Sequence, residues 1–523
     1  MNKIFDYDYV IIGSGFGGSA AALRLSEKGY KVLVIEKGKW LTAKDFPRTN
    51  WNLKKWLWLP FLRFYGFFKI TFYRHIGILS GVGVGGGSLV YANTLPVPQK
   101  NFFLSESWAH LADWENELKD HYLTAKRMMG VAANPALQYG DKALKQLAGE
   151  LGKEKDFAPT DVAVFFGEPG KTVGDPYFNG EGPERAGCTF CGGCMIGCKE
   201  NAKNTLDKNY LYFAQKKGTI IKAESLVYDI TDNGNSNGKE GYSVYWKSST
   251  RLIKSKGEFT AKGIVFAGGV LGTVPLLLKL RESSLKNLSQ RVGYGIRSNS
   301  ESLMGVVAPQ KGTNFSDGIA IGSIFQTDEH SHLEPVRYPS GSGFWRTQIA
   351  PLVSGSNFII RLLKCIWEIV KHPVRYFKMF FVWDWAKKTQ ILLYMRTISG
   401  TLRFKKGLFR MKSVKGDGVL PTAFLPEAAR LAKRFSQIVN GTPGALITEI
   451  IFGIPTTAHV LGGACMGKNI EEGVIDKDNK VFGYQNMFVC DGSMISANPG
   501  VNPSLTILAL SERAMSKIPA KEK

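Results

Sequence analysis

Residues 7–18 of the 523-residue chain read YDYVIIGSGFGG, an apolar run that ends in a glycine motif. The run at 7–12 is typical of a buried parallel strand. The segment SAAALRLSEK at 19–28 predicts a helix, and KVLVI at 31–35 predicts a second strand, which is followed by Glu36. A GxGxxG motif between a strand and a helix of so short a unit predicts a Rossmann-like dinucleotide-binding fold.

Each glycine of this motif has a physical role in such a fold. Gly13 allows the tight turn, Gly15 lets the backbone approach a pyrophosphate, and Gly18 allows the helix to pack closely on the strand. The helix N-terminus then faces the phosphates. Glu36 can accept hydrogen bonds from a ribose diol, and an acid there disfavours the 2′-phosphate of NADP. The position of the unit near the N-terminus and the long chain after it favour FAD over NAD.

Further glycine clusters follow along the chain. Residues 81–91, GVGVGGGSLVY, hold five glycines in seven residues, which predicts a loop whose backbone closely approaches a ligand. GIVFAGG at 263–269 predicts a buried strand and a glycine turn before a helix at 273–279. Near the C-terminus, VCDGS at 489–493 and GVNPS at 500–504 precede a predicted helix at 505–514, which would place backbone amides near a ribityl chain.

A histidine and an asparagine in this last region suit the handling of an alcohol proton. His459 opens the segment HVLGG, whose small residues leave room for a substrate, and Asn502 lies in GVNPS. Histidine is the side chain most often used as a general base near neutral pH.

Together these motifs resemble those of the glucose–methanol–choline (GMC) oxidoreductases, and within them a bacterial cholesterol oxidase-like subgroup with a CxxCxxCxxxC segment. The resemblance covers nearly the whole chain and implies that bound FAD oxidises an alcohol, with His459 and Asn502 over the flavin. It also places Val227 beside the adenine and Gly492 near the isoalloxazine, while Tyr91 stands where cholesterol oxidases have asparagine. The predicted cofactor-binding residues are Gly13, Gly15, Phe16, Gly17, Gly18, Glu36, Gly87, Tyr91, Val227, Asp491, Gly492 and Ser504.

One segment departs from the pattern that the resemblance implies. Cholesterol oxidases that also isomerise the steroid double bond use a glutamate in a segment that reads roughly Ala-Pro-x-x-x-Gly-x-Glu, and residues 350–357 here read APLVSGSN. Asn357 cannot carry a proton between two carbons as a carboxylate can. We therefore expect isomerisation to be absent or to depend on another acid, such as Glu368.

The resemblance leaves three functions open. The leading one is oxidation of a secondary alcohol on a sterol or other lipophilic substrate to a ketone, with oxygen as electron acceptor. The second is an FAD dehydrogenase of another hydrophobic alcohol, which passes electrons to a quinone, a redox protein or an iron–sulfur relay. The third is a flavin-bound membrane or interaction protein without turnover.

Four of the seven cysteines fall within CTFCGGCMIGC at 188–198. The spacing of Cys188, Cys191, Cys194 and Cys198 is that of a ferredoxin-type ligand run, in which the fourth cysteine usually serves a second cluster. No second run exists here, and no proline follows Cys198. An iron–sulfur cluster, a zinc ion, disulfides and unligated thiols all remain open on the sequence alone.

The chain carries a formal net charge of +23, which favours anionic partners. A recognised nucleic-acid-binding motif is missing, so we expect no nucleic acid. Two aromatic and basic segments, 51–79 and 358–394, are too interrupted by charge to span a bilayer. They suggest either contact with a membrane interface or buried helix edges with snorkelling lysines.

The N-terminal sequence lacks the apolar region of a secretory signal, and the cysteines do not resemble a secreted disulfide framework. We therefore expect a cytoplasmic protein, with a peripheral site at the inner face of the membrane as the alternative. The expected fold is α/β, α+β overall. A Rossmann-like FAD-binding domain with a parallel sheet would comprise residues 1–95, 186–295 and 455–523, and a substrate-binding or cap domain with a mainly antiparallel sheet and helices would comprise 96–185 and 296–454.

Overall fold

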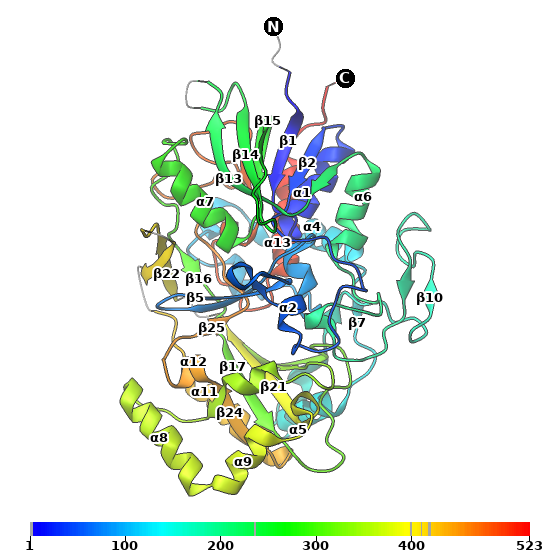
Figure 1. The fold of residues 1–523 in the computed structure, drawn as a ribbon, viewed down its shortest axis with the longest axis vertical. Coiled ribbons are helices and arrows are strands. Elements are labelled where there is room, and N and C mark those ends of the chain that lie inside the picture. The colour runs from blue at the N-terminus through cyan, green and yellow to red at the C-terminus, as the bar shows by residue number, and fades with distance from the viewer. Residues whose placement is uncertain (1–3, 235–236, 398–399, 409, 417–419, 523) are drawn as a thin grey trace.

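Two seven-stranded sheets organise the chain, one at the end where the termini lie and one at the opposite end (Figure 1). The computed structural model describes residues 4–234, 237–397, 400–408, 410–416 and 420–522. The mixed architecture is the α/β fold with a Rossmann-like unit that the sequence predicts.

The first sheet is parallel at its core. Its strand order is β12-β2-β1-β15-β14-β13, and β26 also pairs with β15. Strands β12, β2, β1, β15 and β26 run parallel, whereas β14 and β13 form an antiparallel meander. Val10 lies opposite Leu33 and Ile264, and all three side chains are buried. The bounds are β1 (Tyr7–Ile12), β2 (Val32–Ile35), β12 (Ile220–Lys222), β13 (Ser225–Asp232), β14 (Tyr242–Ser248), β15 (Lys256–Phe266) and β26 (Met487–Val489).

Helices cover this sheet and bring the two ends of the chain together. Helix α1 (Phe16–Glu27) packs against α13 (Ser504–Ser516) and α6 (Tyr210–Lys216), and α13 packs in turn against α4 (Trp114–Met128). Small residues such as Ala20, Ala21 and Ala22 allow α1 to approach its neighbours closely. Helix α7 (Val270–Glu282) follows β15 and lies beside the meander. The predicted helices at 19–28, 273–279 and 505–514 therefore exist, each beginning one to three residues earlier.

The second sheet is antiparallel and separates a helical layer from the interior of the molecule. Its order is β20-β24-β17-β21-β19-β18-β8. Leu392 and Tyr394 pack with α5 (Tyr139–Glu150) and α11 (Pro426–Ile438), whereas Leu393 and Met395 face the opposite side, as the two-residue period of a strand requires. The bounds are β8 (Phe157–Pro159), β17 (Ser302–Val307), β18 (Ser323–Asp328), β19 (Ser331–Val336), β20 (Ile349–Pro351), β21 (Thr389–Arg396) and β24 (Thr442–Leu446).

Smaller elements connect the two halves. Strands β25 (Thr456–Thr457), β6 (Gly77–Gly81) and β5 (Phe68–Phe72) form a three-stranded sheet between them. Helices α8 (Phe358–Lys371) and α9 (Pro373–Phe381) form a hairpin that projects from the second half (Figure 1). The remaining elements are α2 (Leu53–Trp56), α3 (Lys100–Phe103), α10 (Trp385–Lys388), α12 (Ile447–Ile450), β3 (Trp58–Leu59), β4 (Phe64–Tyr65), β7 (Ala132–Ala133), β9 (Asp161–Val162), β10 (Thr172–Val173), β11 (Arg185–Ala186), β16 (Ile296–Arg297), β22 (Thr401–Lys405) and β23 (Lys412–Lys415).

The strands of each large sheet fall inside one set of the predicted domain ranges, although the domain boundaries themselves remain a prediction. None of the helices within the described ranges is long and apolar enough to cross a bilayer.

Candidate active site

His459 and Asn502 lie next to each other although 43 positions separate them in the chain. Nδ2 of Asn502 is 3.5 Å from Nε2 of His459. His459 follows β25, and Asn502 lies in the turn that leads into α13. Oδ1 of Asn502 is buried and has no hydrogen-bond partner among the described residues, so it is available to a bound molecule.

Glu301 fixes the histidine from behind. Its Oε1 lies 2.8 Å from Nδ1 of His459, and its carboxylate also accepts hydrogen bonds from Thr457 Oγ1 at 2.6 Å and the Ala458 amide at 3.1 Å. Because an ionised carboxylate only accepts, Nδ1 of His459 must carry the proton, and the lone pair of Nε2 points away from Glu301. Glu301 is a functional residue that the sequence analysis missed.

The charges around Glu301 and His459 favour an ionised Glu301 and a basic His459. Burial would raise the pKa of Glu301, but the contacts with His459, Thr457 and Ala458 hold it below its ordinary value. Burial would lower the pKa of His459, but the charge and hydrogen bond of Glu301 raise it overall. The neighbouring Glu449 is also buried, which raises its pKa well above the usual range. Glu449 is therefore favoured in its neutral form, and the second carboxylate whose charge raises the pKa of His459 is Glu334.

An apolar cavity of about 120 Å³ borders Glu301, His459 and Asn502. Its walls include side chains on the inner face of the second sheet together with two tryptophans: Leu303, Val336, Ile391, Leu393, Trp345 and Trp385. This volume is below the ~300–1,000 Å³ typical of small-molecule sites. A lipophilic substrate larger than the cavity must therefore displace part of the wall on entry.

The predicted nucleotide turn is built as the glycine pattern requires. Gly13 has a φ of +106°, and a Cβ atom there would lie 2.3 Å from the Ala267 carbonyl oxygen. A Cβ atom on Gly18 would lie 2.1 Å from the oxygen of Gly13, and one on Gly17 would lie 1.7 Å from the oxygen of Cys490. Larger residues at these positions are excluded by backbone atoms that cannot move aside.

The glycine-rich loop at 81–91 lies directly on this turn. A Cβ atom on Gly86 would be 2.6 Å from the Cα of Gly15, and one on Gly87 would be 3.3 Å from the Phe16 ring. The Phe16 ring in turn packs edge-on against the ring of Tyr91. The hydroxyl of Tyr91 donates to the Asn204 carbonyl oxygen at 2.7 Å, so its polar atom is used within the protein.

Glu36 stands at the end of β2 as predicted. Its Oε2 accepts hydrogen bonds from the amide of Ser14 at 3.1 Å and its hydroxyl at 2.9 Å, and Oε1 accepts from the Gly38 amide at 2.8 Å. The Ser225 amide donates to the Glu36 carbonyl, which sets Val227 of β13 near the same strand end. The sequence did not predict these contacts of Glu36, and it predicted no role for Ser14.

Asp491 organises the C-terminal part of the site. Its carboxylate accepts from the Gly269 amide at 2.9 Å, from Thr273 Oγ1 at 2.5 Å and from the Ser493 amide at 2.8 Å. The amide of Gly462 donates to the carbonyl of Gly492 at 2.9 Å. The His459 loop is thereby tied to the Asp491–Gly492 turn, and Ser504 begins α13 a short distance along the chain. The residues predicted at both ends of the chain thus meet around the N-termini of α1 and α13.

The residues present fit a dinucleotide. The turn before α1 and the glycine-rich loop offer backbone amides and no side chains that would block a pyrophosphate, and Gly269 and Gly272 face open space. An anion at the N-terminus of α1 meets unpaired backbone amides and the positive end of the helix.

The predicted metal ligands do not form a metal site. Cys188, Cys191, Cys194 and Cys198 line one cavity of about 20 Å³, but among the described residues no group of three or more His, Cys, Asp or Glu side chains could hold a metal ion. Burial raises the pKa of Cys194 to about 11 and that of Cys188 still further. All seven cysteines are free. The structure therefore does not support the iron–sulfur or zinc site predicted for this segment.

Lys203 gives the cysteine segment a structural connection instead. Its buried ammonium donates to the carbonyls of Leu89 at 3.1 Å, Tyr91 at 2.9 Å and Cys194 at 2.8 Å. Burial lowers the pKa of Lys203 to about 7. The lysine thus joins the cysteine segment to the end of the glycine-rich loop.

The expected isomerase positions lie outside the cavity. Asn357 is exposed and caps α8, where its side chain accepts a hydrogen bond from the Ile360 amide at 3.0 Å. Glu368 lies on α8, and its carboxylate is 3.5 Å from the Tyr376 hydroxyl. Neither residue borders the cavity beside His459, so the structure does not place Glu368 where it could exchange a proton with the substrate.

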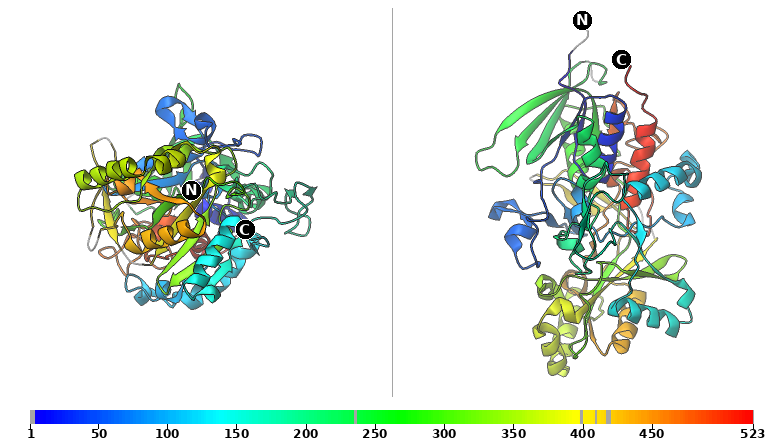
Figure 2. Two further views of the ribbon diagram at one scale, coloured as in Figure 1. Left: turned by 90° about the horizontal axis from the view of Figure 1, so that it is seen from below. Right: turned by 90° about the vertical axis from the view of Figure 1, so that its right-hand side faces the viewer.

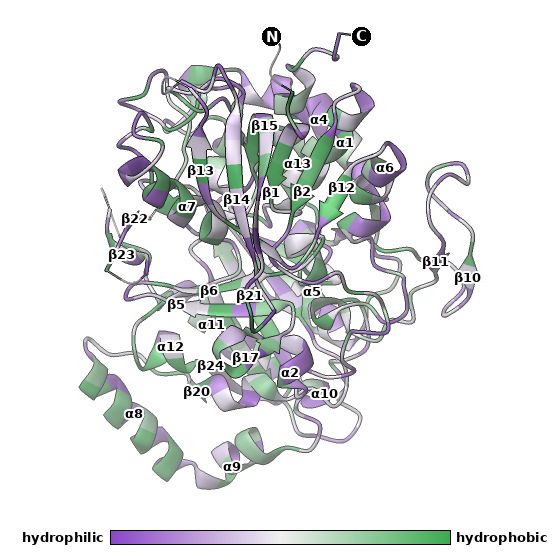
Figure 3. Cartoon of the chain, turned by 45° about the horizontal axis from the view of Figure 1, so that its top comes forward, coloured by the Kyte–Doolittle hydropathy of each residue, from purple (hydrophilic) through white to green (hydrophobic). Residues whose placement is uncertain are grey.

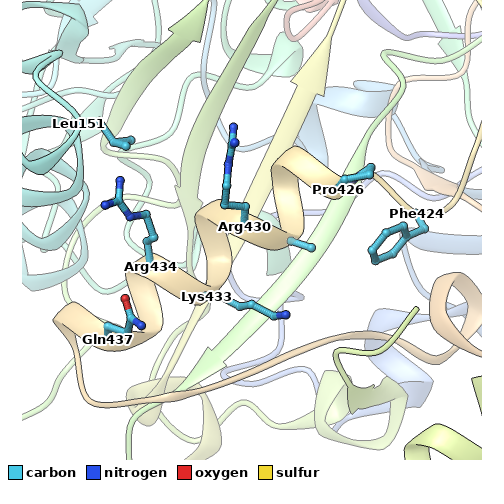
Figure 4. A pocket seen from close by; sticks show the side chains of 8 residues that line it. Leu151, Phe424, Pro426, Arg430, Lys433, Arg434 and Gln437 are labelled. Atoms are coloured by element: carbon cyan, nitrogen blue, oxygen red, sulfur yellow. The ribbon is translucent and has the colours of Figure 1, made fainter. Parts of the chain in front are cut away.

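A second groove, of about 580 Å³, runs along α11. Figure 4 shows Arg430, Lys433 and Arg434 projecting from this helix, with Leu151 across the groove. None of the predicted site residues borders it, and we assign it no part in the reaction.

Comparisons with known proteins identify the family of the chain. Residues 422–511 match the family model of the GMC oxidoreductases, and residues 11–44 match the model of an NAD(P)-binding Rossmann-like domain. A cholesterol oxidase of Acinetobacter baumannii is 44% identical over 99% of this chain and 95% of its own length. A cholesterol oxidase of Mycobacterium tuberculosis is 40% identical over 99% of this chain and 92% of its own.

More distant proteins share the architecture. A long-chain-alcohol oxidase of Arabidopsis thaliana is 23% identical over 98% of this chain and 67% of its own. Among solved structures, pyridoxine 4-oxidase from Mesorbium loti superimposes with a TM-score of 0.63 at 17% identity, covering 98% of both chains. On the two cholesterol oxidases and the family model, the chain belongs to the GMC oxidoreductase family, in its cholesterol oxidase-like subgroup.

Proposed function

We propose that the chain is an FAD-dependent oxidase that converts a secondary alcohol on a sterol or similarly lipophilic molecule into a ketone. The observation that carries this proposal is the Glu301–His459–Asn502 group beside an apolar cavity. The names of the two cholesterol oxidases and the plant long-chain-alcohol oxidase support a lipophilic alcohol as substrate.

The proposed roles follow from the geometry. Bound FAD would supply the acceptor for the hydride that leaves the carbinol carbon. Nε2 of His459 accepts the hydroxyl proton, because Glu301 keeps Nδ1 protonated and stabilises the resulting imidazolium. Asn502 holds the substrate oxygen through its side-chain amide. The apolar walls exclude water from the reacting atoms.

The proposed FAD contacts form two groups. Gly13, Gly15, Phe16, Gly17, Gly18 and Gly87 surround the pyrophosphate, with Glu36 and Val227 toward the ribose and adenine. Asp491, Gly492 and Ser504 approach the ribityl chain and the flavin. The ring of Tyr91 packs on that of Phe16, which supports a place for Tyr91 in the wall of the proposed FAD-binding site.

For the electron acceptor and the location we propose oxygen and the cytoplasm, with peripheral contact at the inner face of the membrane. The names of the relatives as oxidases support oxygen. The net charge of +23 supports attraction to an anionic surface.

Turnover of a sterol tests the proposal. The purified flavoprotein should lose its flavin absorbance when mixed with cholesterol without oxygen, and in air it should form about one peroxide per ketone. Rapid reduction of a quinone or dye with little peroxide would instead favour the dehydrogenase. Failure to bleach with any hydroxylated lipid would favour a protein without turnover.

A buried carboxylate near the cavity suggests that isomerisation is retained. Glu334 of β19 is fully buried, and neither of its oxygens accepts a hydrogen bond from a described residue. A ring nitrogen of His332 lies 3.5 Å from Oε1. Glu334 shares a strand face with Val336 and lies opposite Leu393, both of which line the cavity. We propose that Glu334 moves the proton that converts a β,γ-unsaturated ketone into its conjugated isomer.

Glu334→Gln is expected to slow this isomerisation by about 10²-fold or more, since the amide cannot exchange a proton. The assay is the rise of enone absorbance from a β,γ-unsaturated ketosteroid. Glu368→Gln serves as the control and should isomerise at the rate of the unchanged enzyme. Full isomerisation by Glu334→Gln would show that this residue is not the acid concerned.

A further inference from the structure

Helix α8 turns its apolar side chains away from the protein. Ile359, Leu363, Ile366 and Val370 recur at helical spacing and are all exposed, while Cys365 is the buried side chain of this helix. A surface helix of a globular protein normally turns such a stripe toward the core. The green bands along α8 in Figure 3 mark the apolar residues of this helix.

Helix α9 and the residues after it continue the apolar surface. Phe377 is 64% exposed, Phe381 is 69% exposed and Trp383 is 92% exposed, while Trp367 at the end of α8 is 64% exposed. The rings of Phe377 and Phe381 stack with their centroids 4.9 Å apart. Such a continuous exposed surface marks a binding surface, because soluble monomers rarely leave one uncovered. We call the exposed faces of α8 and α9, with Trp383, the hairpin surface.

The charges around the hairpin surface have one dominant sign. Between residues 358 and 381 the sequence carries five cations and a single carboxylate, Glu368. The cations are Arg361, Lys364, Lys371, Arg375 and Lys378. Aromatic and aliphatic side chains on one face with lysine and arginine around them are the composition of helices that lie in a membrane interface.

The hairpin surface lies directly behind the wall of the active-site cavity. Tyr376 and Met379, on the inner side of α9, pack in one cluster with Trp345, Ile349 and Trp385. Trp345, Ile349 and Trp385 also line the cavity beside His459. One layer of side chains thus separates the hairpin from the space proposed for the substrate.

A second apolar tip projects on the same side of the molecule. The right-hand view of Figure 2 shows the hairpin of β3 and β4 projecting on the side that α8 and α9 occupy. Phe61 and Leu62 at its tip are exposed and are followed by Arg63. Elsewhere in the aromatic segment 51–79, Trp51 and Phe72 are also exposed, whereas Trp56 and Phe68 stack in the interior. Of the two predicted interfacial segments, 358–394 therefore presents the larger exposed surface.

We infer that the hairpin surface docks the enzyme on a lipid bilayer that contains anionic lipids, with its aromatic rings among the acyl chains and its cations at the headgroups. Charge complementarity favours this occupant over a second copy of the chain, because two copies would bring like-charged cations together. Docking would place the cavity wall against the bilayer, so that a lipophilic alcohol passes to His459 without crossing water. The delivery step rests on the proposed oxidation of a lipophilic alcohol, whereas the docking, which assigns a surface to the proposed membrane contact, does not depend on that activity.

Flotation of the full-length flavoprotein with vesicles tests the docking. The probes are vesicles of phosphatidylcholine alone and of phosphatidylcholine mixed with phosphatidylglycerol. We expect the unchanged protein to float with the mixed vesicles, and the triple variant Trp367→Ala, Phe377→Ala, Phe381→Ala to bind them roughly a hundredfold more weakly. A second variant, Lys371→Gln with Lys378→Gln, should lose the preference for the anionic lipid.

The matched control removes exposed apolar side chains elsewhere. Leu252→Ala with Ile253→Ala, two exposed residues between β14 and β15, should leave flotation unchanged. Equal binding by the triple variant, or equal loss in this control, would overturn the docking proposal. Conversion of an oligomer into a monomer by the triple variant, without a change in flotation, would overturn it in favour of self-association.

Turnover separates this inference from the proposed function. The triple variant should oxidise sterol dispersed in detergent at the unchanged rate and oxidise sterol dissolved in mixed vesicles at least tenfold more slowly. If the unchanged protein oxidises no sterol in either form, the proposed function fails while flotation still decides the docking. If detergent and vesicle rates fall together in the triple variant, the delivery step is wrong.

Discussion

Replacing His459 by asparagine is expected to lower the rate of alcohol oxidation by about 10²–10⁴-fold while FAD stays bound. Nε2 of His459 is the basic atom that faces the cavity, because Nδ1 is committed to Glu301 at 2.8 Å. An asparagine side chain can still donate to Glu301 but cannot take up the hydroxyl proton. The loss of activity should therefore come from the chemical step, and FAD binding should be unchanged.

The measurement is the rate of flavin bleaching by sterol without oxygen, with the flavin content of each preparation taken from its absorption spectrum. His330→Asn is the matched control, because His330 is exposed and lies outside the cavity. The control should reduce its flavin at the rate of the unchanged enzyme. If His459→Asn did so as well, the hydroxyl proton would have to leave by another route and our assignment of the base would be wrong.

The parts of the site that sequence could predict are those with a local physical cause. Gly13 and Gly18 follow from the sterics of one turn, and a few adjoining residues reveal that turn. The pairing of His459 with Asn502 could be expected because both belong to motifs of the resembling family. Glu301 lies 158 positions from His459, in a segment without a recognisable motif, so only the folded chain shows the contact.

The structure does not support the metal site predicted from spacing, and it places the segment matched to the isomerase motif outside the cavity lining. The cysteine segment has the spacing of a cluster-binding run, but its side chains line a space of only about 20 Å³, Cys191 among them is exposed, and the described residues lack the grouping of a metal site. Asn357 matches a motif position but cannot exchange a proton, and it caps α8 and does not line the cavity. The spacing of residues in a sequence does not determine how the loop that carries them is oriented in the folded chain.

The aromatic segment 358–394 could not be interpreted from its sequence because a stripe of apolar side chains has the same period whether it faces a core or a lipid. Burial decides between the two. The stripe of α8 faces outward, whereas Tyr376 and Met379 of α9 face inward. This part of the chain thus joins the substrate cavity to the surface, a relation that no motif encodes.

Replacing Glu301 by glutamine is expected to change the reaction in two ways. The rate at the pH optimum should fall by roughly a hundredfold, because the glutamine no longer fixes the proton on Nδ1 of His459 or balances the charge of the imidazolium.

The acidic limb of the pH profile of Glu301→Gln should also move. Glu301 raises the pKa of His459 above its ordinary value, and the unchanged enzyme loses activity as the pH falls through that pKa. Without the carboxylate, burial lowers the pKa of His459, so His459 stays neutral, and the residual activity persists, to lower pH.

Glu449 provides the matched control for this shift. It is a second buried glutamate beside Glu301, and burial raises its pKa well above the usual range, which favours its neutral form. Glu449→Gln therefore removes no charge, and its profile of kcat/KM against pH should superimpose on that of the unchanged enzyme. Glu301→Gln should differ from both in its plateau and in its acidic limb. A lower plateau with an unmoved limb would mean that Glu301 only positions the ring, whereas an acidic limb displaced to higher pH would contradict the ion pair, since loss of a carboxylate beside an imidazole cannot stabilise its charged form.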